Sequence, residues 1–219
     1  MTSLPKQRGE SRVLPAFAIV AVVAILAWLP GRYRLLPPSA VLVVVATLMG
    51  SIFAASLAPR NRVVTRVERY AVLGMALLLA CLEVALLAVL LFNIVARHPG
   101  VDALRLLSTA VAVWVINVLV FALAYWQLDR GGPSGRANNW RGRADISFPA
   151  GNPSDGVPQD WQPDFVDYLF HSFSTATAFS AADSVPLTPR AKMLMMWEAV
   201  ISLVTILAVA ARAINILGS

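Results

Sequence analysis

Apolar residues in this chain come in long blocks rather than at the spaced positions of an amphipathic helix. Five blocks have the length and the Ile, Leu, Val and Ala content of a membrane-spanning helix, and they cover residues 13–29, 39–57, 70–96, 106–128 and 193–217. A helix needs about 20 mostly apolar residues to cross a hydrocarbon core roughly 30 Å thick. The pattern therefore predicts an all-α polytopic membrane helical bundle with five transmembrane helices.

The composition agrees with this prediction. Of the 219 residues, 58% are hydrophobic and only 14% are charged, which is typical of a membrane protein. The first block ends with Trp28 and Leu29 and is followed by Pro30 and Gly31, without the small residues of a signal-peptidase cleavage site. We expect it to stay in the protein as the first helix of a hairpin, in a multi-pass protein of the cytoplasmic cell membrane.

Four regions follow from this pattern. We expect a disordered N-terminal tip at residues 1–12, a four-helix transmembrane region at 13–128, a polar surface loop at 129–163, and a re-entrant segment with the last transmembrane helix at 164–219. The loop carries five prolines and six glycines, a composition that favours turns over a regular helix. Its aromatic residues are expected at the level of the lipid headgroups.

A short helix is predicted between that loop and the last span. Pro163 and the acidic residues Asp164 and Asp167 form a favourable helix start. A helix of about 15 residues reaches roughly 22 Å, which is too short to cross the bilayer. A short helix, a polar turn and a span together predict a re-entrant hairpin, in which protein or water must shield the non-helical backbone from lipid.

The same segment resembles a known family. A helix rich in aromatic residues and Ser leads into Thr175-Ala176-Thr177-Ala178-Phe179-Ser180-Ala181-Ala182-Asp183, followed by Pro186 and Thr188. In this order and spacing the segment resembles the pore helix, selectivity filter and inner helix of the tetrameric potassium-channel superfamily. The resemblance implies a pore module made from several copies of the chain, with pore or filter positions at Thr175, Thr177, Ala178, Phe179, Ser180, Ala181, Ala182 and Asp183.

The filter positions depart from that family at its glycines. Ser180 and Ala182 stand where the family has glycine, and Ala181 stands where it has tyrosine. Phe179 replaces the valine of the family. Carbonyl oxygens that all point to one axis need positive φ angles, which cost an L-residue about 1–2 kcal/mol each. The sequence therefore predicts the architecture of the pore without its potassium selectivity.

A second resemblance covers most of the chain. With Tyr125-Trp126-Gln127-Leu128-Asp129-Arg130-Gly131-Gly132-Pro133 at the end of the fourth block, the chain is similar to a group of bacterial multi-pass membrane proteins. Those proteins are channel-like in their C-terminal part and have no established activity.

Five polar residues lie at or near membrane depth: Glu83, Asn93, Asn117, Glu198 and Arg212. An unpaired charge there costs at least about 2.5–3.5 kcal/mol, so each should face the bundle interior or water. Two interpretations remain open. The glutamates could line an ion or proton path together with the hydroxyls of Thr175, Thr177 and Ser180, or the polar groups could make interhelical hydrogen bonds that fix the packing. For Arg212, snorkelling to the membrane surface is favoured.

Basic residues are unevenly distributed between the two membrane faces that five spans would create. Of the 18 Lys and Arg residues, 13 fall on the face with residues 1–12, the segment after the second span and the loop at 129–163. The positive-inside rule makes this face cytoplasmic. In a potassium channel the pore loop enters from the outer face, so the charge count and the resemblance predict opposite orientations for the hairpin.

No motif for catalysis or cofactor binding occurs in the sequence, so we expect no enzyme activity and no cofactor. Cys81 is the only cysteine, and neither a Cys nor a second His lies near His171 in the sequence, so no metal site is expected. The net charge of +6 is accounted for by basic residues that flank the spans and does not indicate a nucleic-acid partner.

The expected partners are the lipid bilayer, further copies of the chain in a homo-oligomer and monovalent ions. The expected function is that of an integral membrane protein with an ion-channel-like pore module that is non-selective or non-conducting. The alternative is a structural or regulatory membrane protein without transport activity.

Overall fold

A computed structural model describes residues 10–29, 62–95, 103–137, 142–149, 161–180 and 183–217, and scattered positions between 37 and 57. Most of the predicted second span at 39–57 lies outside the described residues. The positions of that span that are described are all helical, namely residues 46, 47, 49, 50, 52–54 and 57.

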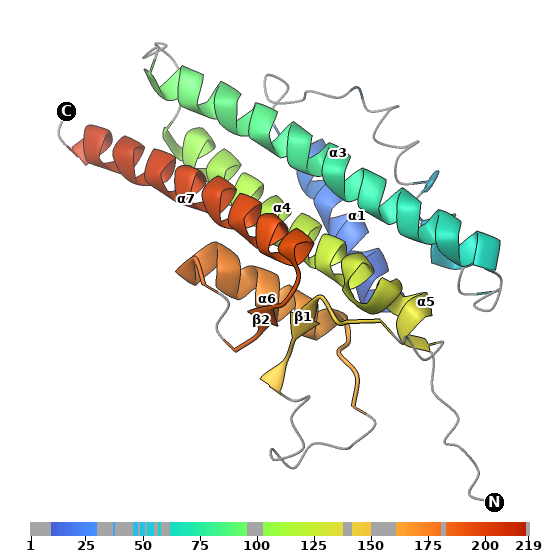
Figure 1. Cartoon of the computed structure of the whole chain (residues 1–219). Helices are drawn as coiled ribbons and strands as arrows, with labels where there is room; N and C mark the ends of the chain where they lie inside the picture. The colour runs from blue at the N-terminus through green and yellow to red at the C-terminus, as the bar shows by residue number, and fades with distance from the viewer. Residues whose placement is uncertain are drawn as a thin grey trace, which may run out of the picture.

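Four long helices make up the body of the described part of the chain: α1 (Val13–Trp28), α3 (Arg62–Val95), α4 (Ala103–Leu128) and α7 (Pro189–Leu217) (Figure 1). Within the described residues, three stretches are long and apolar enough to cross a membrane: Val63–Val89, Leu107–Ala137 and Pro189–Ala211. α1 is apolar but shorter, with 16 residues. The prediction of an all-α fold is confirmed, whereas the count of five membrane helices stays a prediction.

The central element is α4, which lies between α3 and α7 and also contacts α1 (Figure 1). All residues from 120 to 127 are buried, so this part of the helix is covered on every side. Ile116 belongs to one buried cluster with Val22 of α1 and Leu79 of α3. A helix that is apolar and buried all round serves as the core of a bundle.

The stretch after α4 differs from the predicted polar surface loop at 129–163. It forms a 3-10 helix, η2 (Asp129–Gly131), then α5 (Gly132–Ala137) and a short strand, β1 (Ile146–Ser147). Its polar residues Asp129, Arg136 and Asp145 are buried. The prediction was wrong for these residues because their charges find partners inside the protein, which composition alone does not reveal. Residues 150–160 lie outside the described part.

Gly132 has a specific role in this turn. Its φ angle is +77°, a left-handed conformation that glycine adopts without strain. A β-carbon at this position would lie 2.6 Å from Oε1 of Gln127 and 3.2 Å from its backbone oxygen. The Gly-Gly pair therefore lets the chain fold closely back on the end of α4 instead of leaving it as an extended loop.

The short predicted helix is present as α6 (Phe165–Ala178), which has 14 residues and packs against α4 and α7 (Figure 1). After α6, the strand β2 (Val185–Pro186) pairs antiparallel with β1, with Pro186 opposite Ile146. α7 begins three residues later. The two-residue sheet thus holds the start of α7 against the segment that follows α4.

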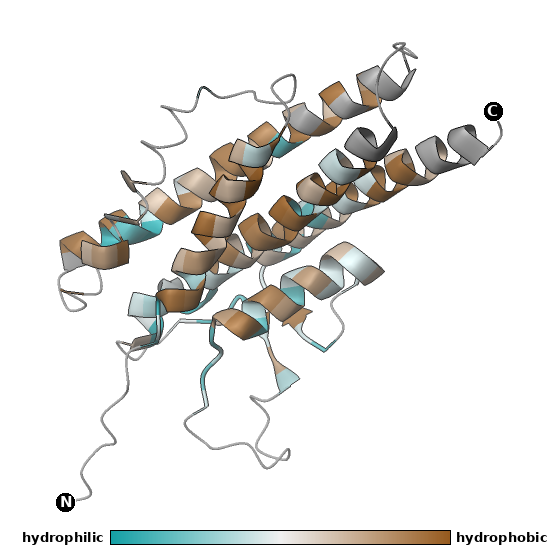
Figure 2. Cartoon of the chain, turned by 180° about the vertical axis from the view of Figure 1, so that it is seen from behind, coloured by the Kyte–Doolittle hydropathy of each residue, from teal (hydrophilic) through white to brown (hydrophobic). Residues whose placement is uncertain are grey.

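Hydrophilic residues gather at the end of the bundle where α3 begins, whereas hydrophobic residues dominate along the helices (Figure 2). Three ion pairs link the elements near this end: Arg12–Glu68, Arg136–Glu10 and Arg190–Asp145. These pairs bring together the starts of α1, α3 and α7 and the end of α4. The prediction that the N-terminal region and residues 129–163 share one membrane face stays a prediction. Which side of a membrane this face occupies stays a prediction.

Candidate functional site

The candidate functional site is the hairpin made by α6 and the start of α7, because it contains the predicted pore segment. The Asp164 carboxylate accepts backbone N–H groups from Val166 at 2.8 Å and from Asp167 at 3.4 Å. The Asp167 carboxylate in turn accepts the N–H of Asp164 at 2.8 Å. This capping box satisfies amide groups that the first turn leaves free. The helix start lies close to the predicted one, with Asp164 as the cap instead of Pro163 as the first helical residue.

α6 runs antiparallel to α4. Near its start, the Tyr168 hydroxyl donates to Oδ2 of Asp129, directly after α4, at 2.8 Å. Near its end, Nε1 of Trp114 donates to the backbone oxygen of Ala176 at 3.5 Å. α6 therefore extends from the end of α4 towards its middle.

The chain then returns to the end of α4 from which α6 started. Arg190 at the start of α7 binds Asp145 through two hydrogen bonds, Nε to Oδ1 at 2.6 Å and Nη2 to Oδ2 at 2.7 Å. The N–H of Asp145 donates to Oδ1 of Asp129 at 2.7 Å. Both arms of the hairpin are thus fixed to Asp129. The segment leaves the end of α4 and returns to it, which is the course predicted from the sequence.

The predicted filter threonines belong to the last turns of α6. Oγ1 of Thr175 donates to the backbone oxygen of His171 at 2.9 Å, and Oγ1 of Thr177 donates to that of Phe173 at 2.7 Å. Threonine commonly bonds in this way to the carbonyl four residues earlier in a helix. The hydroxyls of Thr175 and Thr177 are therefore engaged with their own helix, and the structure does not bring them together with the glutamates as a polar path.

The helix ends in a tight bend at Phe179, whose φ and ψ angles are 55° and 22°. This is the left-handed conformation, which costs an L-residue roughly 1–2 kcal/mol. The positive φ angle thus falls on Phe179 and not on Ser180, which stands at a glycine position of the channel family. Ala178, Phe179 and Ser180 are exposed at this bend, Asp183 is exposed on the returning segment before β2, and Ala181 and Ala182 lie outside the described residues.

The buried face of the hairpin carries a polar cluster around Glu198 of α7. One carboxylate oxygen accepts the hydroxyl of Tyr125 at 2.7 Å, and the other contacts the hydroxyl of Ser172 on α6. Oγ of Ser172 also donates to the backbone oxygen of Val118 at 2.8 Å. Glu198 therefore connects α4, α6 and α7 in the interior of the bundle.

The hydrogen count in this cluster favours a protonated Glu198. The Ser172 hydroxyl has one hydrogen but contacts two acceptors, the Val118 carbonyl and the Glu198 carboxyl. If Glu198 carries a proton, it donates to Ser172, and Ser172 donates to Val118. If Glu198 is ionised, the single hydroxyl hydrogen of Ser172 can serve only one of its two acceptors, and the other contact has no hydrogen between its oxygen atoms. A neutral carboxyl also avoids the cost of a buried charge.

Glu83 of α3 has a different environment. It is 1% exposed, and neither of its carboxyl oxygens has a hydrogen-bond partner among the described residues. It lies within electrostatic range of Glu198. Asn117 donates through Nδ2 to the backbone oxygen of Glu198 at 3.3 Å, while its own Oδ1 has no partner in the described part. The structure thus brings three predicted intramembrane polar residues into one region and leaves three of their oxygen atoms unpaired.

The other two predicted polar residues cannot be placed in the same way. The backbones of Asn93 and Arg212 belong to α3 and α7, but their side chains lie outside the described residues. His171 is buried, contacts Ser184 through Nδ1 and packs edge-on against Tyr125, with ring centroids 4.6 Å apart. Within the described residues, no three His, Cys, Asp or Glu side chains are grouped as metal ligands.

Sequence reasoning missed the ion pairs that fix the base of the hairpin. Arg136 donates to the backbone oxygens of Trp126 and Asp129, both at 3.0 Å, and to the Glu10 carboxylate at 2.7 Å. Glu10 and Arg12 fall in the predicted disordered tip at residues 1–12, yet both are held by ion pairs. The prediction was wrong for them because no local pattern relates Glu10 to a partner 126 positions away.

Burial also changes the acid strength of one of these groups. Desolvation raises the pKa of the Glu10 carboxyl above its ordinary value of 4.5, although the charge and hydrogen bonds of Arg136 act in the opposite direction. The Arg136 guanidinium lies 5.0 Å from the centre of the Tyr168 ring, within the range of a cation–π contact. These contacts join the N-terminal segment to the base of α6.

Comparison with known proteins finds no protein-family model, no curated protein and no solved structure that matches the chain.

Proposed function

We propose that this protein is a multi-pass protein of the cytoplasmic cell membrane with an ion-channel-like pore module. The observation that carries the proposal is the course of the hairpin. α6 starts at the end of α4, and Asp129 and Asp145 hold the returning chain at that same end. Non-helical backbone at membrane depth is tolerated where protein or water surrounds it, and in a re-entrant hairpin neighbouring copies or water would surround this tip.

The outer face of α6 supports assembly of several copies. Val166, Phe170 and Phe173 are 50%, 52% and 47% exposed, and their spacing of four and three residues places them in one stripe along the helix. Because one chain supplies one hairpin, a pore requires further copies around a common axis. In such a homo-oligomer, the stripe would pack against the neighbouring copy.

The residues at the tip argue for conduction of monovalent ions without potassium selectivity. A potassium filter needs a ring of backbone carbonyls, and the positions that would supply it carry Ser180 and Asp183 with no glycine between residues 175 and 183. An acidic residue near a pore entrance favours cations. Asp183 is exposed on the segment that returns from the tip to β2 and would have this effect.

A structural or regulatory membrane protein without transport activity is the second candidate. One observation favours it: Glu198 is bonded to Tyr125 and Ser172 and is fully buried. A cluster that is satisfied internally fixes packing and leaves no polar surface for a permeant ion.

Electrical recording from the purified protein in planar bilayers separates the two candidates. The pore module predicts a current above that of the empty bilayer, and Asp183→Asn should lower its preference for cations over anions. Glu198→Gln is the matched control, because it changes a buried carboxyl away from the tip and should leave ion preference unchanged. A bilayer that stays silent over a range of salts and voltages would favour the structural alternative.

The course of the hairpin can be tested separately from conduction. In a Cys81→Ala background, single cysteines at Arg143 and Lys192, both exposed, flank the hairpin in the sequence. A membrane-impermeant maleimide should modify both from the same side of the membrane. Modification from opposite sides would mean that residues 143–192 cross the bilayer, and the pore module would then be ruled out.

A further inference from the structure

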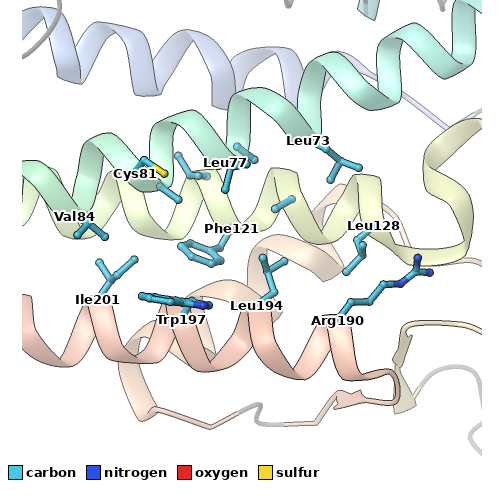
Figure 3. Close-up of a pocket in the computed structure, with 14 residues that line it drawn as sticks. Leu73, Leu77, Cys81, Val84, Phe121, Leu128, Arg190, Leu194, Trp197 and Ile201 are labelled. Atoms are coloured by element: carbon cyan, nitrogen blue, oxygen red, sulfur yellow. The ribbon is translucent and has the colours of Figure 1, made fainter.

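An apolar groove of about 610 Å³ lies between α3 and α7, with α4 at its base (Figure 3). Leu77 and Val84 line it from α3, Phe121 lines it from α4, and Trp197 lines it from α7. Leu77 and Trp197 are exposed, so the groove is open along its side. Among the described residues that line it, Arg190 is the only charged one, and it lies at one end of the row of side chains (Figure 3).

The groove has the length of one leaflet of a bilayer. Its lining residues on α7 extend from Arg190 to Ile201, a rise of roughly 16 Å along a helix. Half of a hydrocarbon core roughly 30 Å thick is about 15 Å. If α3, α4 and α7 cross a bilayer, the groove therefore extends from the membrane surface, at Arg190, to the middle of the bilayer.

The lining of the groove suits a hydrocarbon chain. All of the described residues that line it are apolar except Arg190 at one end. An empty apolar groove would forfeit the dispersion contacts of its lining, and a flexible hydrocarbon chain restores them.

Arg190 supplies a site for an anion at the surface end. Its Nε and Nη2 atoms bind Asp145, while its Nη1 atom has no hydrogen-bond partner among the described residues. The side chain is 50% exposed, and the exposed Lys192 follows two residues later. A guanidinium group with a free donor forms strong, charge-assisted hydrogen bonds to phosphate.

We propose that this groove binds an anionic phospholipid, with one acyl chain between α3 and α7 and the phosphate at Arg190. The site requires that these helices lie in a bilayer, but it does not require the protein to conduct. A bound lipid would bridge α3 and α7 and would link the stability of the bundle to the amount of anionic lipid in the membrane.

Photolabelling of the intact protein in vesicles tests the proposal. Phosphatidylglycerol and phosphatidylcholine that carry a diazirine in one acyl chain would be compared at equal, low mole fraction in phosphatidylcholine vesicles, and the labelled residues would be mapped by mass spectrometry. We expect labelling of groove residues such as Leu77, Cys81 and Trp197 to be about tenfold higher with phosphatidylglycerol, equivalent to roughly 1.4 kcal/mol in binding free energy.

Two neighbouring leucines provide a matched pair of variants. Leu77 lines the groove, whereas Leu78 is exposed on the same helix and does not line it. Leu77→Trp should fill the groove and reduce the labelling of the other groove residues to the level of lipid-exposed residues elsewhere. Leu78→Trp should leave the labelling of the groove residues unchanged. Arg190→Gln should remove the preference for phosphatidylglycerol. Because Arg190 also holds Asp145, the leucine pair keeps the proposal testable if that variant does not fold.

Three outcomes would overturn the proposal. Equal labelling by the two lipids would mean that Arg190 recognises no headgroup. Labelling that Leu77→Trp does not reduce would come from the ordinary lipid shell. Efficient disulfide formation between Cys81 residues of two copies would mean that another copy of the chain covers the groove.

Discussion

Oδ1 of Asp129 accepts the backbone N–H of Asp145 at 2.7 Å, and this contact ties the end of α4 to the segment that anchors α7. The same carboxylate also accepts the N–H of Ile146 at 3.2 Å and the hydroxyl of Tyr168 at 2.8 Å. Asp129 is completely buried. One carboxylate therefore holds the starts of both arms of the hairpin.

We predict that Asp129→Ala lowers the free energy of unfolding by about 3 kcal/mol or more, because it leaves two buried N–H groups and one hydroxyl without an acceptor. Tyr168→Phe removes only one of these bonds, to a charged acceptor, and should cost about 1.5–3 kcal/mol. Denaturant unfolding in detergent micelles measures both. A loss for Asp129→Ala no larger than that for Tyr168→Phe would mean that the carboxylate does not organise the hairpin.

The two buried glutamates should respond in opposite ways to replacement by leucine. Glu83 has no hydrogen-bond partner in the described part, so Glu83→Leu removes a desolvation cost of about 1–3 kcal/mol and should raise the free energy of unfolding. Glu198→Leu leaves the Tyr125 hydroxyl without its acceptor and should lower it by about 1–3 kcal/mol. Thermal unfolding in the same detergent reports the signs. Destabilisation by Glu83→Leu would reveal a partner for Glu83, such as a bound water or ion.

Local signals in the sequence were sufficient to predict α6. Asp164 and Asp167 form the capping box within four residues of each other, and the hydrophobic pattern marks the helix that follows. The apolar blocks likewise predicted α3, α4 and α7, because a membrane-length run of apolar residues has few alternatives to a helix.

Partners far apart in the sequence could not be predicted. Glu83, Asn117 and Glu198 were expected in the bundle interior on energetic grounds, but nothing in their spacing identifies Tyr125 and Ser172 as the partners of Glu198. The burial of Asp145 depends on Arg190 and Thr188, more than 40 positions later. A charged side chain can be buried where a partner of opposite charge or a hydrogen-bond donor lies beside it. A polar composition therefore does not by itself place a segment on the surface.

The stability of the protein should depend on the pH through Glu10. Burial raises the pKa of this carboxyl above 4.5 in the folded state. A carboxyl of this kind adds stability below its unfolded pKa, and this contribution is lost as the pH rises through the folded pKa. The wild type should therefore lose stability relative to Glu10→Gln as the pH increases from about 4 to 7.

Denaturant titrations of both proteins at matched pH values give their difference in unfolding free energy. The contributions of carboxyl groups that both proteins contain cancel in this difference. A shift in favour of the wild type would mean that attraction to Arg136 outweighs burial. The Glu10 pKa would then lie below its ordinary value in the folded protein.

The left-handed conformation of Phe179 predicts an unusual order of stabilities at the tip. Phe179→Ala and Phe179→Gly both remove the partly exposed ring, but only glycine relieves the backbone strain of about 1–2 kcal/mol. Glycine also gains about 0.5–1 kcal/mol of conformational freedom in the unfolded chain. The glycine variant should therefore be more stable than the alanine variant by about 0.5–1 kcal/mol, as measured by thermal unfolding. At a right-handed helical position the order would be reversed, so a more stable alanine variant would place residue 179 in a continuing helix and remove the bend that ends α6.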